Sequence, residues 1–127
     1  MSGIYIHIPF CRKACHYCNF HFSTQIQHLD AFVDALIKEI ALQENYLNSP
    51  IETLYFGGGT PSLLQQAHLD KIVNALHKHF NLSDLKEFTL EANPDDISIE
   101  KTKYWKTAGV NRLSIGIQSF QQEALNW

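Results

Sequence analysis

The sequence of 127 residues predicts an α/β fold, a partial (β/α) barrel that contains about the first half of such a barrel. Strand-like and helix-like segments alternate three times and end on a fourth strand, which favours parallel strands joined by right-handed crossovers. The strands alternate between apolar and polar residues, whereas a sheet covered by helices on both faces would be apolar throughout. A complete barrel takes roughly 250 residues, so four strands make about half of one.

Four short segments rich in β-branched and aromatic residues are predicted to form the strands: residues 4–8, 51–56, 87–92 and 112–117. Their alternation places apolar side chains on one face, which we expect the helices to cover. It places Tyr5, Tyr55, Glu91 and Gln118 on the other face. That second face is polar, so we expect it to line a space filled by water or by a ligand.

Three helices are predicted from apolar residues spaced by three and four, over residues 29–47, 69–80 and 99–107. Ser98 is the expected N-cap of the third helix, and Gly109 is expected to terminate it just beyond its last turn. A fourth helix is predicted to begin near Gln121.

Charge and cysteine content restrict the classes of function. The formal net charge is −3 and there is no run of Lys or Arg, so the sequence indicates no nucleic-acid partner. The N-terminus lacks the pattern of a signal peptide. Three closely spaced cysteines, an odd number, argue against a disulfide framework. We therefore expect a reducing, cytoplasmic setting.

The three cysteines lie within eight residues, at Cys11, Cys15 and Cys18, just after the first strand. Active sites of (β/α) barrels lie at this end of the strands. Three thiolates could hold three irons of a [4Fe–4S] cluster and leave the fourth iron open. With His16 or His21 as a fourth ligand, the same thiolates could instead bind zinc. The spacing alone leaves cluster and zinc about level.

The other predicted strands also end in glycine-rich or polar segments. Gly57, Gly58 and Gly59 follow the second strand and would let the backbone approach a ligand closely. No Lys follows them, which argues against a nucleotide P-loop. Glu91 and Gln118 end the polar faces of the third and fourth strands. Parallel strands bring these ends together, so the pattern predicts one shared ligand site.

These segments together resemble the radical S-adenosylmethionine (SAM) superfamily, and in particular the branch that contains oxygen-independent coproporphyrinogen III oxidase and the heme chaperone HemW. The resemblance covers nearly the whole chain. It is carried by CxxxCxxC at residues 11–18, YIHIPFC at 5–11, YFGGGTP at 55–61, EANP at 91–94 and RLSIGIQSF at 112–120. It implies that residues 1–127 are the N-terminal portion of a TIM-like radical SAM core, with the C-terminal part of the barrel and any further domain absent.

The resemblance favours iron–sulfur over zinc and implies a [4Fe–4S] cluster on Cys11, Cys15 and Cys18. SAM would chelate the open iron, and one electron from the cluster would cleave it to methionine and a 5′-deoxyadenosyl radical. No catalytic residue is assigned. The residues that the resemblance implies for SAM binding are Tyr5, Tyr17, Gly58, Gly59, Thr60, Glu91 and Gln118.

Phe20 bears on the branch, because the oxidases resembled here carry a further cysteine at that position. Its absence favours a heme chaperone over the alternative, a radical coproporphyrinogen III decarboxylase, and leaves open whether the protein is an enzyme. A zinc-stabilised binding module is the alternative of another class. The expected partners are heme or a porphyrin, an electron donor such as a flavodoxin or ferredoxin, and respiratory proteins that receive heme.

Overall fold

The computed structural model describes residues 2–10 and 22–115 of the chain. It contains a four-stranded parallel sheet in the order β1-β2-β3-β4, so the predicted α/β architecture is confirmed. The strands and helices follow one another along the chain as β1 (Ser2–Ile8), α1 (Phe22–Leu42), β2 (Ile51–Gly58), α2 (Gln66–His79), β3 (Glu87–Ala92), α3 (Ile99–Ala108) and β4 (Arg112–Ile115). Two short 3-10 turns, η3 (Pro61–Leu63) and η4 (Pro94–Asp96), follow β2 and β3.

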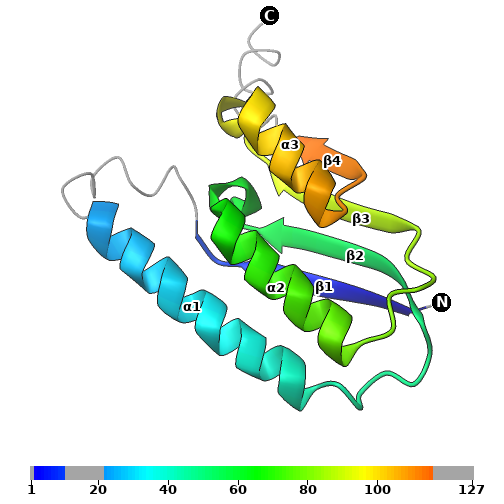
Figure 1. Ribbon diagram of the computed structural model, residues 1–127. Helices are drawn as coiled ribbons and strands as arrows, with labels where there is room; N and C mark the ends of the chain where they lie inside the picture. The colour runs from blue at the N-terminus through cyan, green and yellow to red at the C-terminus, as the bar shows by residue number, and fades with distance from the viewer. Residues whose placement is uncertain (1, 11–21, 116–127) are drawn as a thin grey trace, which may run out of the picture.

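All three helices lie on one face of the sheet, as Figure 1 shows. The core fills the space between the two layers and includes Ile8, Phe56, Leu90 and Trp105, each almost fully buried. Ile8, Phe56 and Leu90 belong to the apolar strand face that alternation predicted, and Trp105 reaches the core from α3. The opposite face carries Tyr5, which is 55% exposed. The helices therefore cover only the apolar face, and in the described residues the polar face has no helical cover.

Several boundaries differ from the prediction: β1 begins at Ser2, α1 at Phe22 and α2 at Gln66. At two other boundaries the reason can be identified. β2 extends two residues beyond the predicted end, because Gly57 and Gly58 stay in register with His7 and Ile8 of β1. Helix α1 ends at Leu42, so Leu47, predicted in the helix, lies beyond it and packs against the core from the following loop. Residues 116–117 and the helix predicted near Gln121 lie outside the described residues.

The ends of α3 follow the sequence closely. The Ser98 side chain accepts a hydrogen bond from the backbone N–H of Lys101, so it is the N-cap that was predicted. Gly109 closes the helix at a φ of 110°, a left-handed conformation that favours glycine. Across the described part of the chain, no helix has the length and apolar character that crossing a membrane would need.

Candidate cofactor site

The structure places five of the predicted site residues on or just after β1, β2 and β3, with Tyr5 in the middle of β1 and the other four at or beside the carboxyl ends of β2 and β3. These residues are Tyr5, Gly58, Gly59, Thr60 and Glu91. The remaining predicted residues lie outside the described ranges: Cys11, Cys15 and Cys18 of the metal site, and Tyr17 and Gln118 of the SAM site. The described part of the site therefore consists of the sheet residues and the chain up to Phe10, the residue before the first cysteine.

The Glu91 carboxylate is held by two groups of the neighbouring strand β2. The Tyr55 hydroxyl donates to Glu91 Oε2 at 2.6 Å, and the backbone N–H of Gly58 donates to Glu91 Oε1 at 3.0 Å. The hydrogen bond to Glu91 is the main cause that raises the pKa of Tyr55 above its usual value, and burial adds to it. Tyr55 therefore stays a hydrogen-bond donor at neutral pH.

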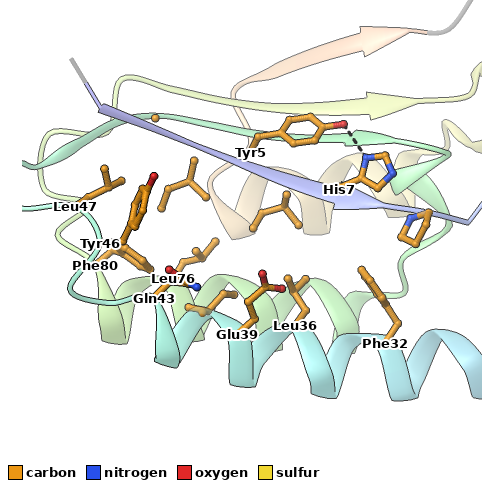
Figure 2. Close-up of a pocket in the computed structure, with 15 residues that line it drawn as sticks. Tyr5, His7, Phe32, Leu36, Glu39, Gln43, Tyr46, Leu47, Leu76 and Phe80 are labelled. Carbon is orange, nitrogen blue, oxygen red and sulfur yellow. Dashed lines mark hydrogen bonds between the residues drawn. The ribbon is translucent and has the colours of Figure 1, made fainter.

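Tyr5 and His7 project from β1 on the side opposite α1, as Figure 2 shows. The Tyr5 hydroxyl and His7 Nδ1 are hydrogen-bonded at 3.1 Å. The Tyr5 ring also stacks on the Tyr55 ring, with 5.8 Å between centroids and 24° between planes. A continuous row of polar and aromatic groups thus runs from His7 through Tyr5 and Tyr55 to Glu91, across β1, β2 and β3.

Gly57 makes room for that row. A Cβ at this position would lie 2.7 Å from Tyr55 Cε1, 2.9 Å from Glu91 Oε1 and 3.0 Å from Tyr5 Cε2. These distances are too short for a methyl group, so a side chain here would push the three residues apart. Sequence reasoning assigned no individual role to Gly57 or Tyr55. Alternation did place Tyr55 on the polar face, which is the signal that could have found it.

Gly59 and Thr60 hold the segment that leads into the cysteines. The backbone N–H of Gly59 donates to the carbonyl of Ile8 at 2.7 Å, and that of Thr60 donates to the carbonyl of Phe10 at 2.6 Å. A Cβ on Gly59 would lie 2.2 Å from the Phe10 oxygen. The glycine segment was expected to approach a ligand closely. At Gly59 the close approach is instead to the backbone of Ile8 and Phe10.

The loops after β2 and β3 are joined beneath this site by a buried polar cluster that sequence reasoning missed. The Ser62 hydroxyl donates to Asp96 Oδ2 at 2.9 Å and accepts from the backbone N–H of Asn93 at 3.2 Å. Lys101 Nζ donates to the Ser62 carbonyl at 2.9 Å. Ser62 and Asp96 are both buried. The cluster thus fixes the loop that carries the glycines relative to the loop that follows Glu91.

A separate cavity of about 500 Å³ lies between β1 and α1 (Figure 2). Its helical wall is largely apolar and includes Phe32, Leu36 and Ile40. Tyr5 and His7 also border it, but their side chains point to the other face of β1. The cavity and the row from His7 to Glu91 therefore lie on opposite faces of the strand.

The residues of the polar face suit the polar groups of a ligand such as SAM. Glu91 uses one lone pair of each oxygen within the protein, so further lone pairs can accept hydrogen bonds from ligand hydroxyls or an amine. Gly58 has a φ of 104° and brings its backbone beside the His7 ring, where a Cβ would lie 2.6 Å from the ring atoms. The lone pairs of Glu91 that remain open to a ligand fit the hydroxyls and amine of the cofactor that the resemblance implies.

Comparison with known proteins agrees with this arrangement. A profile of the radical SAM superfamily matches residues 5–127. The chain is 44% identical over 128 residues to the heme chaperone HemW of Bacillus subtilis, covering 98% of this chain and 34% of that protein. It is 33% identical over 124 residues to the oxygen-independent coproporphyrinogen III oxidase of Salmonella typhimurium, covering 95% of this chain and 27% of that protein.

Among solved structures, the chain is similar to the coproporphyrinogen III oxidase HemN of Escherichia coli, which is described as a radical SAM enzyme. The TM-score is 0.75 at 31% identity, and the match covers 92% of this chain and 27% of the other. This similarity confirms the predicted partial barrel of radical SAM type. The chain spans about a third or less of the length of these relatives. The profile match and the shared fold place the chain in the radical SAM superfamily.

Proposed function

We propose that this chain is the N-terminal part of a HemW-type radical SAM protein, which binds a [4Fe–4S] cluster and SAM and acts as a heme chaperone. The observation that carries the proposal is the joined polar face, where Tyr5, Tyr55 and Glu91 meet beside the glycine segment. Glu91 and the glycine segment lie at the carboxyl ends of β3 and β2, and (β/α) barrels bind their ligands at that end of the strands. The superfamily match and the HemW relatives support the same assignment.

Cys11, Cys15 and Cys18 are the residues proposed to hold the cluster. When bound, the cluster and SAM would supply one-electron cleavage of SAM. The described residues contribute to this site by holding the backbone that leads into the cysteine segment, because Gly59 and Thr60 bond to the carbonyls of Ile8 and Phe10 just before Cys11. Holding the start of the cysteine segment in place reduces the conformational entropy that the segment would lose on binding a cluster.

Tyr5, Tyr17, Gly58, Gly59, Thr60, Glu91 and Gln118 are the residues proposed to bind SAM. Glu91 would accept hydrogen bonds from polar groups of the ligand, because two donors already hold its carboxylate in one orientation. Thr60 is buried and its backbone N–H is bonded to Phe10, so it would act mainly by shaping the loop.

The heme chaperone assignment rests on two features of the sequence. The identity to HemW of Bacillus subtilis is 44%, against 33% to the Salmonella typhimurium oxidase. Phe20 also replaces the cysteine that the resemblance gives to the oxidases. The proposed partners are heme or a porphyrin, an electron donor of the flavodoxin or ferredoxin kind, and respiratory proteins that accept heme. The proposed location is the cytoplasm.

Coproporphyrinogen III decarboxylation is the second candidate function, because the similar HemN structure belongs to an oxidase of that substrate. The two functions are separated by reconstituting the full-length protein anaerobically and running two assays on the same sample. One assay titrates heme and follows its absorption; the other supplies coproporphyrinogen III, SAM and reductant. We expect saturable heme binding without porphyrin conversion. Sustained conversion of coproporphyrinogen III, with many turnovers per chain, would show that the protein is an oxidase and would overturn the chaperone assignment.

A further inference from the structure

The phenol of Tyr55 lies between two residues proposed to contact SAM, Tyr5 on β1 and Glu91 on β3. We propose that Tyr55 is a positioning residue of the SAM site, which orients the Glu91 carboxylate through its hydroxyl and supports the Tyr5 ring with its own ring. The inference rests on the proposed function, because it assigns a role at the site where SAM is proposed to bind.

The Tyr55 hydroxyl and the Gly58 N–H together fix the orientation of the Glu91 carboxylate. A carboxylate on a flexible side chain can rotate about its last bond at little cost. In Glu91 each oxygen is bonded to a different donor, the Tyr55 hydroxyl at 2.6 Å and the Gly58 N–H at 3.0 Å. Two bonds to two oxygens fix the plane of the group. Without the Tyr55 hydroxyl, the Gly58 N–H alone would leave that plane free to turn.

The Tyr55 hydroxyl is the donor of the bond to Glu91 Oε2. A tyrosine orients a carboxylate well only while its hydroxyl carries the proton. The bond to Glu91 raises the pKa of Tyr55, and the nearby Ser114 side chain opposes this shift only in part. Tyr55 therefore keeps its proton through the pH range in which the protein works, and the bond is a charge-assisted one.

The Tyr55 ring makes a contact of its own, separate from that of the hydroxyl. Tyr55 stacks on Tyr5 at 5.8 Å, and Gly57 has no side chain that would separate Tyr55 from Tyr5 and Glu91. Replacing Tyr55 by Phe keeps the stacking and removes only the hydroxyl. A single substitution can therefore test the hydrogen bond without disturbing the aromatic contact.

The test uses the full-length, anaerobically reconstituted protein as wild type, Tyr55→Phe, Glu91→Gln and the double variant. The measurements are the Kd of SAM by calorimetry, the iron content per chain and the Tm. Tyr46→Phe is the matched control, since Tyr46 is 79% exposed and lies outside the row from His7 to Glu91. Tyr55→Phe removes one of the two bonds that orient the Glu91 carboxylate, so we expect it to raise the Kd of SAM roughly tenfold. Iron content should stay at the wild-type value, as in the control, and each Kd is measured well below the Tm of its variant.

The double variant distinguishes positioning from an independent contact. If Tyr55 acts through Glu91, adding Tyr55→Phe to Glu91→Gln should weaken SAM binding little further. Fully additive losses would overturn the inference, and so would wild-type affinity in Tyr55→Phe. A loss of iron in Tyr55→Phe, or a fraction of unfolded protein large enough to account for the weaker binding, would also overturn it, because the role would then be structural. A wild-type protein that holds no SAM would instead refute the proposed function itself.

Discussion

Gly59 lies where the end of β2 touches the segment that leads into the cysteines. Its N–H bonds to the Ile8 carbonyl, and the neighbouring N–H of Thr60 bonds to the Phe10 carbonyl. No Cβ fits at Gly59, because it would meet the Phe10 oxygen at 2.2 Å, and a backbone carbonyl cannot turn aside as a side chain can. Gly59 is thus required for a contact within the chain, because it packs against Phe10, the residue just before the proposed metal ligand Cys11.

Gly59→Ala should therefore reduce the iron retained by the full-length protein after anaerobic reconstitution, because it displaces the backbone just before Cys11. Gly109→Ala is the matched control. Gly109 has a φ of 110°, so alanine there should cost about 1–2 kcal/mol of stability without affecting iron. Iron assays and thermal melts on both variants check this. Full iron content in Gly59→Ala would contradict the role given to the glycine.

The raised pKa of Tyr55 makes a prediction about alkaline pH. The folded state holds the proton more tightly than the unfolded state, whose tyrosine titrates near 10.0. The stability that the Tyr55 hydroxyl contributes should be complete below pH 10.0 and should decline as the pH rises toward the folded pKa. Urea unfolding of wild type and Tyr55→Phe at a series of pH values should show a difference that narrows only on the alkaline side. A difference that narrows toward acid pH instead, or not at all, would contradict this.

At the scale of elements, the site depends on two loops that follow neighbouring strands. The buried Ser62 hydroxyl connects Asp96 of η4 with the backbone N–H of Asn93, and Lys101 of α3 bonds to the Ser62 carbonyl. Buried polar groups are stable only when they are paired, so each member of this cluster holds the next in place. The cluster thus transmits the position of the β3 loop and α3 to the loop that carries the glycines.

Ser62→Ala should lower the free energy of unfolding by about 1–3 kcal/mol, because Asn93 and Asp96 each lose a buried partner. The same substitution at Ser83, which is exposed and bonds only to Asn81 beside it, should change stability by less than about 0.5 kcal/mol. Urea denaturation of the two variants side by side measures both effects. Equal effects at the two serines would show that the buried cluster contributes no special stability.

The strands and the ends of α3 could be predicted from the sequence because their causes are local. Alternation gives the faces of the strands, and Ser98 and Gly109 cap α3 with bonds to nearby backbone. The contact between Tyr55 and Glu91 could not be predicted in this way. It depends on the register between β2 and β3, and shifting that register by two residues would leave the same side chains on the same faces. Ser62 and Asp96 have the residue types of surface turns, and only the fold buries them.

At the scale of the whole molecule, one face of the sheet packs against the helices, and the other face carries the candidate site. The helices pack on the apolar face, where a hydrogen bond between Asp30 and the buried His68 joins α1 to α2. A second bond, between Glu44 and His79, joins the turn after α1 to the end of α2. The polar face holds its own network at the strand ends. This division is the one that the strand alternation predicted.

The central claim is that this polar face serves a cluster held by Cys11, Cys15 and Cys18 and the SAM bound to it. The most direct measurement is the metal and sulfide content of the full-length protein after anaerobic reconstitution, with its visible spectrum before and after dithionite and a titration with SAM. The account predicts about four irons and a matching amount of sulfide per chain, a brown colour that dithionite bleaches, and saturable SAM binding. A colourless protein with about one zinc, no iron and no affinity for SAM would contradict it.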